Sequence, residues 1–223
     1  MSFQILRVLD PPEIQAVVGG LASRKFADGK LTAAGLARDV KNNLQVERTG
    51  PEKTDLDEIV FAALRRNSVF QDFVIPKRLA MPHYSRYEPG MQYGAHVDGA
   101  VMGSGTANPM RTDLAMTIFL APASSYDGGE LVIELPVGEQ EIKLEAGEAV
   151  VYQAGTMHRV NPVTRGVRLA VVTWIQSAVT DERIREILFE LNKVNQAADN
   201  LSQESRALLA KAYNNLLRLH IDL

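Results

Sequence analysis

The feature that most constrains the fold of this chain is a series of short apolar or alternating segments between residues 69 and 175. Each segment is about as long as an ordinary β-strand, and glycines, prolines and acidic residues separate one segment from the next. Many short strands at this spacing favour a β-sandwich or jelly roll over alternating β-α units. We expect strands at residues 69–75, 79–87, 114–120, 131–135, 141–144, 149–152, 158–163 and 167–175.

Helical patterns flank this region on both sides. Residues 10–13 read Asp-Pro-Pro-Glu and predict a helix start, because a capping side chain precedes proline and an acidic first turn. Residues 54–57 match a capping box, and the helix that they open should end near residue 66. Beyond the strands, Thr180 should cap one more helix, and a last helix should begin near Glu204. The segment between the first two of these helices, residues 26–46, carries no clear pattern.

These patterns predict an α+β protein with a mainly β core. We expect a double-stranded β-helix, or jelly roll, with N-terminal buttressing helices and a C-terminal helical appendage. Residues 1–68 would form the N-terminal support, residues 69–178 the jelly-roll core and residues 179–223 the helical unit. The C-terminal unit should dock on the core or on a partner subunit, which would allow a homo-oligomer to form through these helices.

Composition excludes several classes of site. The 223 residues include no cysteine, which rules out disulfides, thiolate zinc sites and cysteine nucleophiles. The net charge of -3 argues against a standing surface for nucleic acid or anionic membrane. No window has the apolar length of a membrane span, and the first residues do not resemble a secretory signal. We therefore expect a soluble cytoplasmic protein.

His96 and Asp98 lie two residues apart, just after a turn. In an extended strand residues i and i+2 point to the same face, so both side chains can bind one metal ion. His158 is a third candidate ligand and again follows a turn that contains glycine. Two imidazoles and one carboxylate on one face of an ion, with other positions open, are typical of non-haem Fe(II) oxygenases. A chance pairing of histidine and aspartate is the alternative interpretation.

Arg168 is the main candidate for binding an anion. It should point into the core if Leu169 and Val171 face the other way, and a buried guanidinium needs an anionic partner. A small dicarboxylate could supply that partner through a bidentate pair, whereas an internal aspartate or glutamate is the structural alternative. Tyr87 could reach the same carboxylate. His83, on the same strand face as Tyr87, would either line the mouth of the site or pack in the core.

The segment from residue 99 to 111 is rich in small and turn residues, so we expect an irregular loop. A long loop that leaves a ligand-bearing strand is often a lid over the site. Its side chains do not identify the substrate.

Several segments together carry a family resemblance. They are Tyr87-Glu-Pro-Gly, His96-Val-Asp98, Gly128-Gly-Glu-Leu131, Tyr152-Gln-Ala-Gly-Thr-Met-His158-Arg-Val-Asn-Pro-Val and Gly166-Val-Arg168. These segments resemble the Fe(II)/2-oxoglutarate dioxygenases of the prolyl-hydroxylase type, and the closest match is to bacterial PKHD-type hydroxylases. The similarity extends over nearly the whole chain.

The resemblance implies that His96, Asp98 and His158 hold Fe(II) at the catalytic centre. It also implies that Arg168 binds the distal carboxylate of 2-oxoglutarate, with Tyr87 beside it, and that L-ascorbate restores oxidised iron. Such an enzyme uses O2 to oxidise an unactivated C–H bond of a small molecule or peptidyl substrate and releases succinate and CO2.

Two other functions stay open from the sequence. A non-enzymatic jelly roll that senses iron or oxygen would need the three metal ligands but not Arg168. An oxidative nucleic-acid dealkylase would share the cofactors, yet that subfamily would require a second arginine a few residues beyond Arg168, where Trp174 stands. We therefore expect a small-molecule or peptidyl substrate and neither nucleic acid nor a membrane as partner.

Overall fold

The computed structural model describes residues 3–48, 50, 54–197 and 201–222. Its larger sheet has the strand order β1-β14-β10-β17-β6-β4-β2, and β5 also pairs with β17. All pairings in this sheet are antiparallel. The strands are β1 (Phe3–Arg7), β2 (Phe26–Asp28), β4 (Leu44–Val46), β5 (Pro76–Leu79), β6 (His83–Tyr87), β10 (Leu114–Phe119), β14 (Glu148–Gln153) and β17 (Arg168–Ser177).

A smaller antiparallel sheet faces the larger one and has the order β13-β12-β15-β7-β3. Its strands are β3 (Lys41–Asn42), β7 (Gln92–His96), β12 (Leu131–Leu135), β13 (Gly138–Ile142) and β15 (His158–Val160). Two short pairs complete the β structure: β8 (Val101–Met102) with β9 (Met110–Arg111), and β11 (Asp127–Gly128) with β16 (Val163–Arg165).

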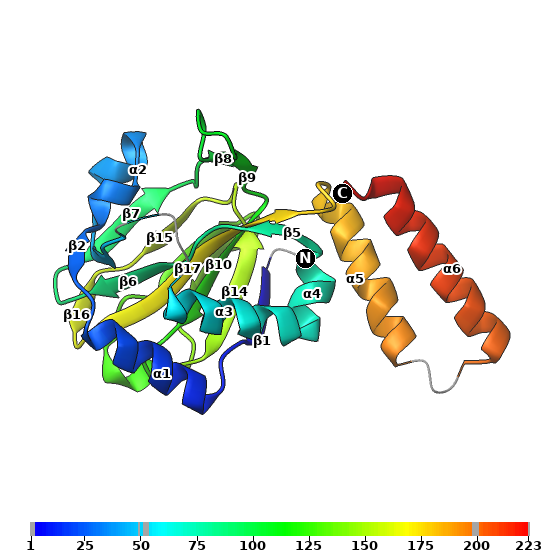
Figure 1. Ribbon diagram of the computed structural model, residues 1–223, viewed down its shortest axis with the longest axis horizontal. Helices are drawn as coiled ribbons and strands as arrows, with labels where there is room; N and C mark the ends of the chain where they lie inside the picture. Colours follow the sequence, from blue (N-terminus) through cyan, green and yellow to red (C-terminus); the bar gives the residue numbers. More distant parts are fainter. Residues whose placement is uncertain (1–2, 49, 51–53, 198–200, 223) are drawn as a thin grey trace.

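Six α-helices lie in the described part of the chain: α1 (Pro11–Ala22), α2 (Gly35–Asp39), α3 (Asp55–Arg66), α4 (Ser68–Val74), α5 (Glu182–Gln196) and α6 (Gln203–His220). Residues Gly29–Thr32 and Ala123–Ser125 form 3-10 helices. Helices α1, α3 and α4 lie along the larger sheet, and α5 and α6 form an antiparallel pair that projects to one side (Figure 1).

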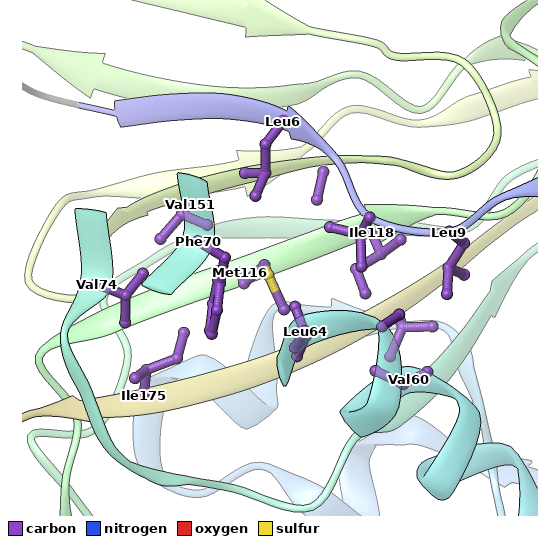
Figure 2. Packing of buried hydrophobic residues seen from close by; sticks show 14 of the residues in the cluster. Leu6, Leu9, Val60, Leu64, Phe70, Val74, Met116, Ile118, Val151 and Ile175 are labelled. Carbon is purple, nitrogen blue, oxygen red and sulfur yellow. The ribbon is translucent and has the colours of Figure 1, made fainter. Parts of the chain in front are cut away.

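The core consists of two apolar layers, one on each face of the larger sheet. Successive side chains of a strand point to opposite faces, so each strand contributes to both layers. On β10, Met116 and Ile118 point toward the helices, whereas Ala115 and Phe119 point toward the smaller sheet. Figure 2 shows the first layer, in which side chains of α3 and α4 such as Phe70 pack against strand residues of the larger sheet. The helices therefore support one face of the sheet and leave the other face for the space between the sheets.

Helix capping explains where the first helices begin. Asp10 accepts a hydrogen bond from the Glu13 backbone N–H, and the Glu13 side chain bonds back to the Asp10 N–H. Thr54 and Asp57 form the same reciprocal arrangement at α3. Both predicted starts are confirmed. At α5 the prediction is wrong by one residue, because Asp181 rather than Thr180 caps the helix.

The expected strand at residues 69–75 is wrong, because this segment is helix α4. Asn67 caps it by accepting a hydrogen bond from the Phe70 N–H at 2.9 Å. Phe70, Phe73 and Val74 are buried at helical spacing against the larger sheet. A short apolar segment of this length fits a strand or a buried helix equally well by periodicity, so the cap decides.

The other expected strands are present. Residues 131–135 form β12 as expected, and the remaining strands have shifted ends. Segment 79–87 divides into β5 and β6 around Pro82, which cannot donate a ladder hydrogen bond, and segment 158–163 divides into β15 and β16. The expectation of an irregular loop at 99–111 is wrong in part, because it contains the β8–β9 hairpin. Strand β1 and the strands between residues 26 and 46 were not expected.

Candidate metal centre

Two neighbouring strands of the smaller sheet bring the predicted ligands together. His158 on β15 pairs directly with His96 on β7, and the two imidazole centroids are 4.3 Å apart. Asp98 follows the end of β7 by two residues. One ligand atom from each of the three side chains lies within 4.8 Å of the others.

The two imidazoles are oriented by the backbone. His96 Nδ1 lies 2.8 Å from the Gly94 carbonyl oxygen, and His158 Nδ1 lies 2.9 Å from the Thr156 carbonyl oxygen. A carbonyl can only accept, so Nδ1 carries the proton in each ring and the Nε2 lone pair is free. The Nε2 atoms lie 3.9 Å and 3.8 Å from the two carboxylate oxygens of Asp98.

Burial sets the protonation of this group. Burial, together with the positive charge that His158 can carry, lowers the pKa of His96 to about 4. His96 is therefore neutral at pH 7, as a metal ligand must be. Burial raises the pKa of Asp98, because little water can solvate its charge, while His158 acts in the opposite direction. A bound cation would offset the cost of this buried carboxylate.

Arg168 lies deep between the two sheets and is only 1% exposed. Its guanidinium carbon is 5.1 Å from the Tyr87 ring centroid and 5.2 Å from that of Phe119. No carboxylate in the described part of the chain forms an ion pair with it, and its Nε has no hydrogen-bond partner there. The internal aspartate or glutamate that was the structural alternative is absent from these residues.

Tyr87 lies directly opposite Arg168 in the β6–β17 register and is buried with it. A glycine turn makes room for the arginine stem. Gly129 has a φ of 67°, and a Cβ there would lie 3.1 Å from Arg168 Cδ. The Gly128-Gly129-Glu130 sequence is thus explained by close packing as well as by turn geometry.

A cavity of about 860 Å³ connects these groups. Its size is within the range of small-molecule sites, roughly 300–1,000 Å³. The lining includes the expected metal ligands and anion-binding residues, namely Tyr87, His96, Asp98, His158 and Arg168. Gly99, Val101 and Met102 from the 99–111 segment also line it.

His83 is not among the described residues that line the cavity. It lies on β6 and packs edge-on against Trp174, with ring centroids 5.2 Å apart. Its role in packing is therefore the one that the structure supports.

Sequence reasoning did not assign Lys41 and Tyr93 to the site, although both line the cavity. The Tyr93 ring stacks on His96 with centroids 3.7 Å apart, and Lys41 Nζ lies 5.1 Å from the centroid of Tyr93. Both belong to the β3–β7 pair. Lys41 stands in a segment without clear periodicity, so spacing alone gave it no role in the site.

Two imidazoles and one carboxylate with free positions fit Fe(II), and an unpaired buried guanidinium in the same cavity fits a co-substrate carboxylate. Residues 82–176 match the family model of the 2OG-Fe(II) oxygenase superfamily. A PKHD-type hydroxylase of Synechococcus sp. (strain JA-2-3B'a(2-13)) is 45% identical over 218 residues, which is 97% of each chain. The chain belongs to the PKHD-type hydroxylases.

Other comparisons agree with this assignment. A PKHD-type hydroxylase of Paraburkholderia phymatum is 40% identical over the whole of both chains. Among solved structures, a Pseudomonas putida prolyl-4-hydroxylase matches with a TM-score of 0.60 at 19% identity, covering 79% of this chain and 92% of that one. A non-haem α-ketoglutarate-dependent carbocyclase from nogalamycin biosynthesis matches with a TM-score of 0.56 at 15% identity, covering 80% of each chain. At this identity these structures establish the fold alone.

The predicted jelly-roll fold, the family and the expectation of a dioxygenase enzyme are confirmed for this PKHD-type hydroxylase. Membership in the 2OG-Fe(II) oxygenase superfamily implies Fe(II) and 2-oxoglutarate. The non-enzymatic sensor is therefore not supported. None of the described helices combines the length and apolar character that a bilayer crossing requires.

Proposed function

We propose that this PKHD-type hydroxylase uses O2 and 2-oxoglutarate to oxidise an unactivated C–H bond of a small-molecule or peptidyl substrate, with release of succinate and CO2. The single observation that carries this proposal is the buried, unpaired Arg168 in the same cavity as the three candidate ligands. A metal sensor would have no use for that guanidinium.

Each residue has a distinct part in the proposal. His96, Asp98 and His158 hold Fe(II), which supplies the activation of O2 and the oxidation when it is bound. The backbone carbonyls that fix the imidazole rings keep both Nε2 atoms directed at the ion. Arg168 orients 2-oxoglutarate by binding its distal carboxylate, and Tyr87 packs beside that pair. The buried walls of the cavity keep water from the reacting atoms.

Succinate formation from 2-oxoglutarate without added substrate tests this function. Purified protein with Fe(II), O2 and 2-oxoglutarate should form succinate slowly. His158→Ala should form none, whereas His220→Ala, which changes a histidine at the exposed end of α6, should match wild type. Absence of succinate from wild type would contradict the proposal.

L-ascorbate belongs to the same proposal as the reductant that returns oxidised iron to Fe(II). No residue is assigned to it. Adding ascorbate should prolong succinate formation without changing its initial rate. An unchanged time course would remove ascorbate from the reaction.

We also propose a cytoplasmic enzyme that does not act on nucleic acid, which is consistent with a net charge of -3. The division into residues 1–68, 69–178 and 179–223 stays a prediction, which limited proteolysis can test.

Helix α6 buries none of its residues and exposes Leu208 and Leu219, so it could pair two subunits. Light scattering should then give twice the mass of one chain, and a monomer would contradict this arrangement.

A further inference from the structure

A buried ammonium group in the cavity wall has no part in the function described so far. Lys41 is only 5% exposed and lines the cavity. No carboxylate of the described residues forms an ion pair with it. Burial lowers the pKa of Lys41 to about 8, so the side chain is still mainly charged at pH 7. Asp98 and Asp28 raise the pKa of Lys41 from a distance, but neither carboxylate contacts the ammonium. A buried charge without a contacting counter-ion is costly unless a ligand supplies one.

A directed chain of hydrogen bonds holds this ammonium in place. Lys41 Nζ donates to Thr32 Oγ1 at 3.0 Å, and Thr32 in turn donates to the side-chain carbonyl of Gln45. The Gln45 amide donates to Ser85 Oγ at 3.1 Å. All four side chains line the cavity. An ammonium has three donors, and Thr32 takes one of them, so the others can bind an acceptor in the cavity.

Lys41 and Arg168 lie on different walls of the cavity. Lys41 lies on β3 at the edge of the smaller sheet, and Arg168 lies on β17 within the larger sheet. One aromatic ring separates the ammonium from the metal centre, since Lys41 contacts the face of Tyr93 and Tyr93 stacks on His96. A group held by Lys41 therefore lies close to the reacting position without using the guanidinium that 2-oxoglutarate requires.

The mouth of the cavity is apolar. Leu36, Val101 and Met157 line the cavity and are 86%, 48% and 40% exposed. Large apolar side chains that are exposed around a cleft mark a surface for an apolar ligand.

We propose that the substrate is an apolar carboxylic acid, whose carboxylate binds Lys41 and whose hydrocarbon part lies against the rim of Leu36, Val101 and Met157. This inference rests on the proposed function, because it names the class of molecule that the oxidation acts on. The carbon that is oxidised lies along the hydrocarbon part, a short distance from the carboxylate. Lys41 is the residue that determines specificity for the acid.

Binding to the inactive protein tests the inference without relying on turnover. Trp174 is the single tryptophan of the chain and lines the cavity, so its fluorescence reports occupancy. The probes are butanoate, hexanoate and octanoate, each compared with its amide, and octyl phosphate. Zn(II) and excess 2-oxoglutarate are present throughout, so that Arg168 and the metal site are already filled.

We expect wild type to bind at least one acid more tightly than its amide, and Lys41→Met to weaken binding of that acid at least tenfold while leaving the amide unchanged. Lys25→Met, which changes an exposed lysine paired with Glu47, should behave as wild type. If Lys41→Met does not fold, as judged by thermal unfolding, Lys41→Gln carries the same expectation.

Three results would overturn the inference. They are acid binding that does not depend on Lys41, no preference of wild type for any acid over its amide, and tighter Lys41-dependent binding of octyl phosphate than of octanoate.

Substrate-free succinate formation separates the two proposals. Lys41→Met should keep the wild-type dependence on 2-oxoglutarate, and a higher requirement would assign Lys41 to the co-substrate instead. If wild type forms no succinate, the proposed function fails while the binding data stand.

Discussion

Arg168 is the residue that most needs a bound ligand, because its guanidinium is buried without an anionic partner. Replacing it with methionine, which keeps an apolar stem between Tyr87 and Phe119, removes the anchor for 2-oxoglutarate. A charge-assisted hydrogen bond contributes about 1.5–3 kcal/mol, so we expect the 2-oxoglutarate concentration needed for half-maximal succinate formation to rise at least tenfold. Stability should change little, because no carboxylate of the described residues forms an ion pair with Arg168.

Arg165→Met is the matched control, since Arg165 is exposed and pairs with Asp127 at the surface. Its dependence on 2-oxoglutarate should equal that of wild type. A large loss of stability in Arg168→Met with unchanged co-substrate dependence would instead show a structural arginine.

His83 gives the protein a dependence of stability on pH. Burial lowers the pKa of His83 to about 4, and the charges of Lys41 and Arg48 lower it as well. Because the folded state favours the neutral ring, its contribution is complete above the unfolded pKa of about 6.5 and is lost as the pH falls toward 4. The shift corresponds to about 3 kcal/mol of unfolding free energy.

His83→Phe keeps the edge-on contact with Trp174 and cannot be protonated. Urea unfolding between pH 7 and 4 should show wild type losing stability relative to this variant. Parallel curves would mean that His83 is as easily protonated in the folded state as in the unfolded state.

For single residues, the sequence was most informative where side chains of suitable chemistry also have the spacing of a strand. The His96-Val-Asp98 spacing places two ligands on one side of a strand, and Arg168 alternates with apolar residues, so its inward direction could be predicted. Lys41 could not be found in this way, because its importance arises from contact with Tyr93 and with residues of another sheet. Contacts of that kind have no signature in local sequence.

Among the helices and strands, helix α3 depends on the Asp57 side chain for its stability. This buried carboxylate completes the capping box by accepting a hydrogen bond from the Thr54 N–H. It also accepts one from Arg48 at 2.7 Å and one from the Tyr84 hydroxyl at 3.0 Å. Burial acts to raise the pKa of Asp57, but the bonds from Arg48 and Thr54 lower it overall. Removing one partner of a buried pair typically costs about 3–5 kcal/mol, so Asp57→Ala should lose that much unfolding free energy.

Asp55→Ala is the control from the same helix, because Asp55 is exposed and pairs with Arg24 at the surface. Exposed pairs contribute about 1 kcal/mol or less. Urea unfolding of both variants should separate the two effects. Equal losses would mean that Asp57 has no special role beyond the first turn.

Helix α4 shows why some elements could not be predicted. Its sequence, Ser-Val-Phe-Gln-Asp-Phe-Val, has apolar residues that fit either a strand or a buried helix. Asn67 decides between them by capping the helix, but asparagine also occurs in many turns between strands. The C-terminal helices were easier, because their apolar stripes are longer than any strand.

For the molecule as a whole, the jelly roll explains how residues far apart in sequence form one site. Strands β7 and β15 are neighbours although some sixty residues separate His96 from His158, and β17 brings Arg168 across from them. The number and spacing of strands predicted this fold, whereas the strand order depends on pairings between distant segments. The C-terminal helices attach through Phe189, whose ring lies 5.3 Å from that of Phe73 on α4.

The central claim is that His96, Asp98 and His158 hold one metal ion. Anaerobic equilibrium dialysis with Fe(II), in the presence of 2-oxoglutarate, measures this directly for wild type, Asp98→Ala and His220→Ala. We predict one ion per chain for wild type and His220→Ala, and an affinity at least a hundredfold weaker for Asp98→Ala. Equal Fe(II) binding by Asp98→Ala and wild type would contradict the account.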